Sequence, residues 1–93
     1  MSISRGVVYS AIDVERDYQD DKYPMFEGLS ASPEGFLLVI EHLLNEGRAK
    51  WAYTDTPKDK GVALDFLRKI AATAVRGMEQ HGVVERTFTK KVA

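Results

Sequence analysis

The chain has 93 residues, which is enough for one domain of ordinary size and for no more. Its 13 basic and 14 acidic side chains give a net charge of −1, so it lacks the basic excess of proteins that bind DNA or RNA polymers. The absence of cysteine excludes disulfide bonds, thiolate metal sites and a cysteine nucleophile.

No segment has the pattern of a signal peptide or of a membrane span. The first residues contain no apolar core of the signal-peptide type. The longest apolar run, Phe36 to Ile40, is far shorter than a bilayer-spanning helix, which needs about 20 residues. We therefore expect a cytoplasmic protein with no membrane partner.

The first periodic segment covers about residues 4–19. Apolar residues recur there at three- and four-residue spacings, which predicts a helix with one apolar face. These residues are Val7, Val8, Ala11, Ile12, Val14 and Tyr18. Residues 20–31 contain Pro24 and Gly28 and predict a loop. Since this loop also carries Tyr23, Met25, Phe26 and Leu29, we expect it to pack on the helices or to line an interface.

Two longer helices are predicted after the loop. Ser32 followed by Pro33 predicts the start of the first of them, which extends to about Ala52, with Gly47 as a small residue that permits close approach of another helix. Residues 53–56 predict a turn, and Thr56-Pro57 repeats the start signal. The last helix ends near His81, before Gly82. Its apolar stripe consists of Ala63, Leu67, Ile70, Ala74 and Met78.

The predicted fold is all-α: one domain over residues 1–93, with a short N-terminal helix followed by a long antiparallel two-helix hairpin. A hairpin of this size leaves one face of each helix uncovered, so we expect a homo-oligomer. For the tail, residues 83–93, the pattern leaves two interpretations open: an arm that packs on a partner subunit, or a partly disordered end.

Candidate catalytic and metal-binding residues are sparse. Helical nucleotide pyrophosphohydrolases hold magnesium with carboxylates three or four residues apart, whereas Glu41 and Glu46 are five apart. His42 and His81 lie on different predicted helices without clustered ligands. We predict no enzyme, no cofactor and no metal. A divergent pyrophosphohydrolase and a non-catalytic protein-binding adaptor remain the alternatives.

Aromatic and basic residues alternate near the N-terminus. Stacking on tyrosine rings and pairing with lysine or arginine is how proteins hold nucleotides, although a small core or an oligomer interface explains the pattern better when it is taken alone. The residues concerned are Tyr9, Tyr18, Tyr23, Phe26, Arg5, Arg16 and Lys22. Arg68 lies near the apolar stripe of the last helix, where an arginine is usually ion-paired or extended toward solvent.

Two motifs resemble a known family. Residues 11–19 read AIDVERDYQ, residues 63–75 read ALDFLRKIAATAV, and residues 78–82 read MEQHG. Both halves resemble, in order, the phage anti-CBASS cyclic-nucleotide sponges, which act against the bacterial cyclic-oligonucleotide-based anti-phage signalling system. The helical hairpin of that family is similar to one in a phage sponge against the Thoeris defence system.

The resemblance implies a function and a set of site residues. The chain would form a homo-oligomer, a hexamer, that binds cyclic dinucleotides such as cGAMP, and cyclic trinucleotides, between protomers without cleaving them. Tyr9 best matches the aromatic that stacks on the bases, with Tyr18 and Phe26 beside it, and Lys22 matches the lysine that meets the phosphates. Arg68 would line a separate pocket for cyclic trinucleotides.

Overall fold

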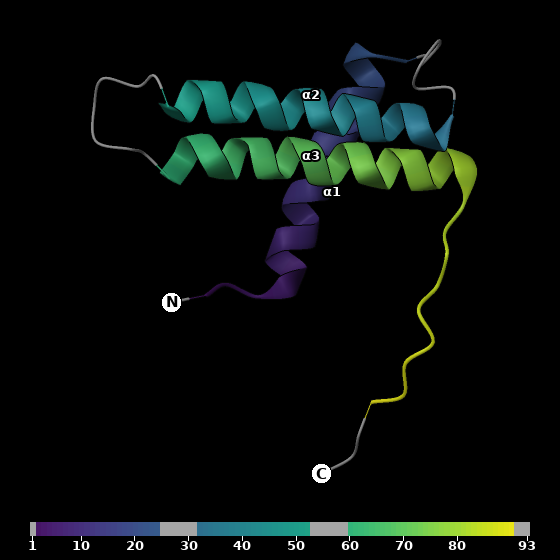
Figure 1. Cartoon of the computed structure of the whole chain (residues 1–93). Helices are drawn as coiled ribbons and strands as arrows, with labels where there is room; N and C mark the ends of the chain where they lie inside the picture. Colours follow the sequence, from purple (N-terminus) through teal and green to yellow (C-terminus); the bar gives the residue numbers. More distant parts are fainter. Residues whose placement is uncertain (1, 25–31, 53–59, 91–93) are drawn as a thin grey trace.

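The computed structural model describes residues 2–24, 32–52 and 60–90. These ranges contain three helices and no strand: α1 (Arg5–Lys22), α2 (Pro33–Ala52) and α3 (Lys60–His81) (Figure 1). The predicted all-α class is therefore confirmed. The predicted turn at residues 53–56, the predicted helix start at Pro57 and the candidate Phe26 lie outside the described residues.

α1 begins where the sequence predicts and ends later. The Ser4 hydroxyl accepts a hydrogen bond from the Val7 N–H at 3.2 Å, which caps the first turn. The helix continues to Lys22, so the prediction that a loop begins at residue 20 was wrong. An ion pair at helical spacing, Arg16 to Asp20 at 3.0 Å, supports these last turns. Pro24 follows the cap residue Tyr23 and stops the helix.

The signals for the start of α2 and the end of α3 are confirmed. The Ser32 hydroxyl accepts a hydrogen bond from the Gly35 N–H at 3.0 Å. At the end of α3, Gly82 has a φ of 100°, a conformation that glycine adopts without strain, and its N–H donates to the Met78 carbonyl at 2.7 Å.

α2 and α3 lie side by side and run in opposite directions (Figure 1). Two glycines allow the close approach. A Cβ added at Gly47 of α2 would lie 2.8 Å from Cγ of Phe66, and one added at Gly77 of α3 would lie 3.0 Å from Cγ of Phe36. Each phenylalanine ring therefore packs directly onto the backbone of the opposite helix, and both rings are buried. The close approach expected at Gly47 is confirmed.

α1 crosses the side of α3 that faces away from this glycine contact, through polar side chains. The buried residues of α1 are Glu15, Arg16 and Gln19. Opposite them α3 presents Ala72, which is fully buried and small enough to let the helices approach. The predicted apolar face of α1 is thus not the buried one: Val7, Val8, Val14 and Tyr18 are exposed. Hydrophobic spacing marked a face of α1 that the described residues leave in contact with solvent.

The apolar stripe predicted for α3 is also largely uncovered. Leu67 and Met78 are exposed, and Ile70 and Ala74 are only half-buried. Phe66, Thr73 and Arg76 are the α3 residues buried together with Ala72. Among the described residues the buried hydrophobic side chains are therefore few, a small core for a chain of this length.

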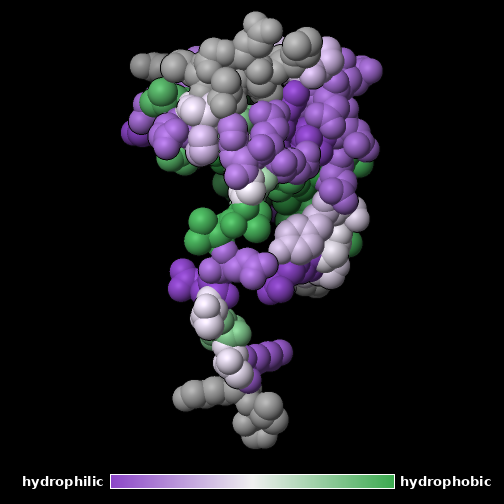
Figure 2. Space-filling model, turned by 90° about the vertical axis from the view of Figure 1, so that its right-hand side faces the viewer, coloured by the Kyte–Doolittle hydropathy of each residue, from purple (hydrophilic) through white to green (hydrophobic). Residues whose placement is uncertain are grey.

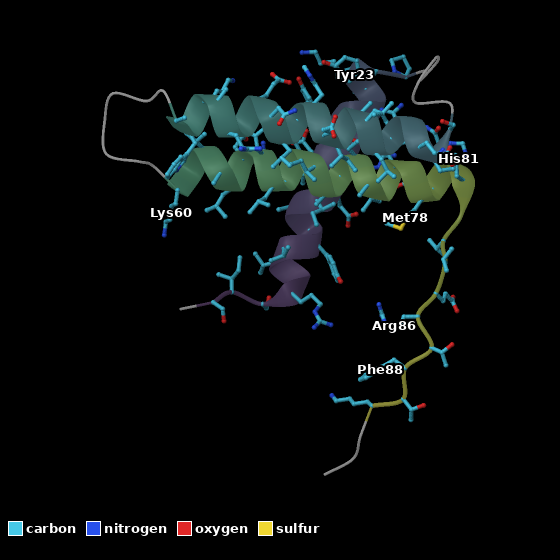
Figure 3. The ribbon with its side chains drawn as sticks, in the orientation of Figure 1. Tyr23, Lys60, Met78, His81, Arg86 and Phe88 are labelled. Carbon is cyan, nitrogen blue, oxygen red and sulfur yellow. The ribbon has the colours of Figure 1, made fainter. Side chains whose placement is uncertain are left out.

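The tail, residues 82–90, leaves the end of α3 and extends away from the helices (Figure 1). Phe88 and Arg86 lie along it, far from α1 and α2 (Figure 3). Hydrophobic side chains gather where the tail begins, and hydrophilic ones follow (Figure 2). Val83, Val84 and Phe88 are exposed, so the described tail makes little use of its apolar side chains within one copy.

Candidate functional site

A cation held between two aromatic rings lies at the C-terminal end of α1. The Lys22 Nζ is 5.6 Å from the centroid of the Tyr18 ring and 5.8 Å from that of Tyr23. Hydrogen bonding to Tyr18 raises the pKa of Lys22, and the charges that Tyr18 and Tyr23 acquire on ionisation add to this effect. Both rings are half exposed, so the cluster offers solvent a charged group and two aromatic surfaces.

Tyr9 lies apart from this cluster. It is 59% exposed, in the part of α1 that projects beyond α3 (Figure 1). Thirteen residues separate Tyr9 from Lys22, which corresponds to about 20 Å along a helix at 1.5 Å per residue. Tyr18 is nine residues away, about two and a half turns, and so lies on the opposite side of α1. The structure thus brings Lys22 and Tyr18 together and leaves Tyr9 separate from both.

Arg68 is occupied by carboxylates. Its Nε donates to Glu15 of α1 at 2.8 Å, and its terminal nitrogen donates to Asp65 one turn earlier in α3. The hydrogen bond with Glu15 is the main reason that the pKa of Arg68 is raised; burial opposes it. A guanidinium between two carboxylates has little charge left to attract a phosphate. Within one copy, Arg68 therefore serves to hold α1 on α3.

Asp65 belongs to the same group of charges. Burial alone would raise the pKa of Asp65, but hydrogen bonds from Arg68 and Lys69 outweigh it and lower the pKa. The Lys69 Nζ lies 3.2 Å from the Asp65 carboxylate and 4.7 Å from the centroid of the Phe66 ring. Lys69 is thereby tied to the α2–α3 contact.

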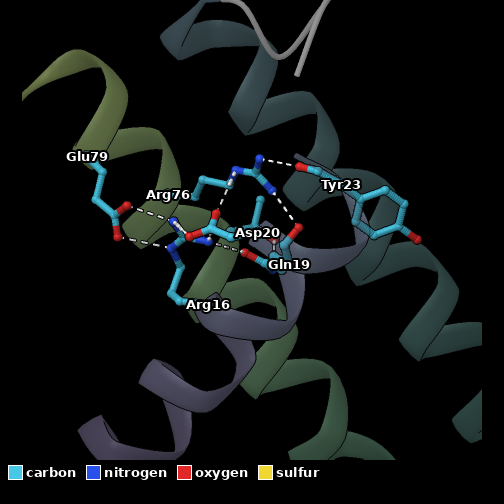
Figure 4. A network of polar contacts seen from close by, with 7 residues as sticks. Arg16, Gln19, Asp20, Tyr23, Arg76 and Glu79 are labelled. Carbon is cyan, nitrogen blue, oxygen red and sulfur yellow. Dashed lines mark hydrogen bonds and ion pairs between the residues drawn. The ribbon is translucent and has the colours of Figure 1, made fainter. Parts of the chain in front are cut away.

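Arg16 forms the second attachment of α1 to α3 (Figure 4). Its guanidinium donates to both carboxylate oxygens of Glu79, at 3.0 and 2.7 Å, while Asp20 takes a third contact at 3.0 Å. The Arg16 side chain is buried, whereas the two carboxylates are about half exposed. The hydrogen bond to Glu79 is the main cause of a raised pKa for Arg16, and that from Arg16 lowers the pKa of Glu79.

Arg76 completes this attachment from the side of α3. It donates to the main-chain carbonyls of Gln19 and Tyr23 at the end of α1 (Figure 4). The Gln19 carbonyl also accepts the Tyr23 N–H at 2.8 Å. The Gln19 side chain in turn donates to the Thr73 hydroxyl at 3.3 Å. Burial lowers the pKa of Arg76, and the nearby Asp20 opposes that change. A cationic side chain at a helix C-terminus also complements the helix dipole.

The importance of this polar network was not predicted from the sequence. The hydrophobic pattern pointed to other faces, because arginine, glutamate and glutamine count as surface residues. One signal was present: Glu15, Arg16 and Gln19 are letters of the motif at residues 11–19, and they are the buried residues of α1. In this structure these three motif residues attach α1 to α3.

Other candidate chemistry is limited in the part of the chain that the structure describes. No group of three or more His, Asp or Glu side chains is placed there to hold a metal ion. His42 is exposed and pairs with Glu46 at 2.9 Å, and His81 lies edge-on to Phe36 at the end of α3. None of the described helices is long and apolar enough to span a membrane.

Comparisons with protein-family models, with curated proteins and with solved structures found no match. The described residues define an all-α chain with two notable surface features. One is the cation–aromatic cluster of Tyr18, Lys22 and Tyr23, and the other is an uncovered hydrophobic face on α2 and α3.

Proposed function

We propose that this protein binds cyclic dinucleotides of anti-phage signalling and holds them without cleaving them. The observation that carries the proposal is the exposed Lys22 ammonium with the rings of Tyr18 and Tyr23 beside it. A cyclic dinucleotide presents phosphates and flat bases, which are the groups that an ammonium and a tyrosine ring bind. Sequestration in the host cell cytoplasm would keep the messenger from its effector.

The separation within α1 requires more than one copy at each ligand. Because Tyr9 and Lys22 are about 20 Å apart along α1, one copy cannot close both onto the same base and phosphate. A homo-oligomer supplies the second copy, with Tyr9 of one α1 placed toward Lys22 of another. A two-fold pocket of this kind has the symmetry of a cyclic dinucleotide. The proposal therefore includes a homo-oligomer, a hexamer, with the ligand held between α1 helices.

Calorimetry with a panel of cyclic dinucleotides tests the proposal. Lys22→Ala should weaken binding about tenfold or more, since a charge-assisted hydrogen bond contributes about 1.5–3 kcal/mol. Tyr9→Ala should do the same through lost stacking, whereas Tyr9→Phe keeps the ring and should bind nearly as well as the wild type. Lys60→Ala, a lysine on another helix, is the matched control.

The fate of the ligand separates this function from its alternatives. Denaturing the complex should return the cyclic dinucleotide intact. Hydrolysed ligand, or pyrophosphate released from nucleoside triphosphates with magnesium, would instead establish the pyrophosphohydrolase alternative. If no cyclic nucleotide binds and Lys22→Ala changes nothing, the sponge proposal is wrong.

A second ligand class concerns Arg68. In the proposal, a cyclic trinucleotide occupies a separate pocket, and its phosphate would have to displace Glu15 or Asp65 from the guanidinium. Arg68→Ala should then abolish trinucleotide binding and spare dinucleotide binding, with Lys60→Ala as control. A purely structural Arg68 would instead lower the unfolding midpoint and weaken both ligand classes together.

The protein-binding adaptor remains a second candidate because of one observation: the hydrophobic face of α2 and α3 is uncovered within one copy. A chain that stays monomeric and still binds no cyclic nucleotide would favour the adaptor.

A further inference from the structure

Two apolar pockets follow one another along the helix pair α2–α3, and we treat them together as one groove. Toward the end that carries the tail it is lined by Leu37, Ile40, Ala74 and Met78, and toward the other end by Leu44, Trp51, Leu67 and Ile70. Leu37, Leu44 and Trp51 are 67%, 48% and 44% exposed. We call these lining residues the groove face.

The groove face and α1 lie on different sides of the helix pair. On α3, the side chains that bond to α1 come from residues 68, 73, 76 and 79, whereas the groove is lined by residues 63, 66, 67, 70, 74, 77, 78 and 81. The two sets interleave at helical spacing and therefore point in different directions. α1 thus leaves the groove face open.

The spacing of the groove face is that of a helix that packs against another helix. Leu37, Leu44 and Trp51 follow one another at intervals of seven residues along α2, with Ile40 and Gly47 between them. A seven-residue apolar repeat places its members on one seam, the pattern of packed helices in coiled coils and bundles. Beside this seam lie Glu41 and Arg48, also seven residues apart.

We propose that the groove face binds a second copy of this chain, with α2 of one copy antiparallel to α2 of the other. A two-fold axis near Leu44 places Glu41 of each copy beside Arg48 of its partner, so two opposite-charge pairs flank the apolar seam. Neither Glu41 nor Arg48 forms an ion pair with another residue in the described ranges. The result is a four-helix bundle built from two α2–α3 pairs.

The chain leaves more surface exposed than a compact monomer of its mass. The chain exposes 7824 Å², whereas a globular monomer of its mass, 10.4 kDa, exposes about 5,400 Å². The excess, about 2,400 Å², includes the extended tail.

This inference rests on the self-association that the proposed function needs, and it names the face that is used. Its test is a charge exchange, read by light scattering and sedimentation. Glu41→Arg and Arg48→Glu should each weaken association about tenfold or more, because both symmetry-related pairs become repulsive. The double variant E41R/R48E should restore association, since it recreates the opposite-charge pairs with their signs exchanged.

The outcomes separate the interface from the function. Glu46→Lys, a charge reversal on the same helix at a residue outside the groove lining that pairs with exposed His42, is the control and should leave the mass unchanged. If the double variant associates no better than the single ones, or if both single variants keep the wild-type mass, the proposed interface is wrong. Dinucleotide calorimetry on the same proteins tests the sponge independently, because that pocket is placed at α1.

Discussion

At the scale of single residues, α1 is attached to α3 by ion pairs whose two partners differ in burial. Arg16 is buried while its partner Glu79 is about half exposed, so water screens the Glu79 carboxylate more than the Arg16 guanidinium. The bidentate geometry still favours the ionised carboxylate, and the Glu79 pKa is lowered accordingly. Asp65, bonded by Arg68 and Lys69, behaves in the same way.

These lowered pKa values predict acid sensitivity. A carboxylate whose pKa is lower in the folded than in the unfolded chain stabilises the fold above its unfolded pKa, about 4 for Asp and Glu. That contribution disappears as the pH falls through the folded pKa. The free energy of unfolding should therefore decrease from about pH 4 downward, as urea titrations at a fixed protein concentration would measure.

A variant assigns this sensitivity to Glu79. Glu79→Gln should lower stability at pH 7 by up to about 1 kcal/mol, the range for exposed pairs, and should show a shallower loss in acid. Glu85→Gln, in the exposed tail, is the control and should follow the wild-type curve. A pH dependence that is the same in wild type and Glu79→Gln would show that the Arg16 pair does not contribute to it.

At the scale of the helices, the α2–α3 contact depends on the two glycines. Gly47→Ala would usually favour a helix by about 0.5–1 kcal/mol. Its Cβ would, however, lie 2.8 Å from Cγ of Phe66, the ring atom nearest the backbone, which has little freedom to move away. We expect a net destabilisation of about 1–3 kcal/mol. Gly6→Ala is a matched control, because its Cβ would be 4.0 Å from the nearest side-chain atom, Oγ of Ser4. Thermal melts showing Gly47→Ala as stable as Gly6→Ala would contradict the close packing.

At the scale of the helices, the sequence predicts helix ends better than it predicts which faces are buried. Helix starts and ends follow from local chemistry, and so Ser32, Pro33 and Gly82 predicted them correctly. The direction of each apolar face depends on which helix lies against it. Val14 and Leu67 belong to the predicted apolar faces, yet both are exposed while Arg16 and Arg76 are buried. Periodicity identifies an apolar face; it does not say whether the chain itself or another copy covers that face.

For the candidate site, contacts within one helix follow from residue spacing, whereas contacts between helices depend on how the helices cross. Lys22 and Tyr18 are four residues apart, but their proximity at helical spacing arises because α1 continues to Lys22, where the sequence predicted a loop. The contacts of Arg68 with Glu15 span 53 positions and required the crossing of α1 over α3. Tyr9 and Lys22 lie on one helix but too far apart to meet, a consequence of helix length that the motif alone does not reveal.

At the scale of the whole molecule, uncovered apolar stripes lie on two separate sides. One is the groove face on α2 and α3. The other is the outer α1 stripe, formed by Val7, Ala11, Val14 and Tyr18, which points away from the buried residues of α1. Two different self-complementary faces allow a chain to join a different copy through each. Two-fold interfaces that alternate around a ring close it with an even number of copies, and six is such a number.

The last prediction separates the two faces. Arg48→Glu should break the α2 interface and leave pairs joined through α1, whereas Val14→Glu should bury a charge in the outer α1 stripe and leave pairs joined through α2. The combined variant should be monomeric, with helicity retained by circular dichroism. Light scattering would give the mass of each. Because Tyr18 of the proposed ligand site belongs to the outer α1 stripe, Arg48→Glu pairs should still bind a cyclic dinucleotide and Val14→Glu pairs should not. A single variant that falls directly to monomers would show that one face holds the entire assembly, and the ring of alternating interfaces would then be wrong.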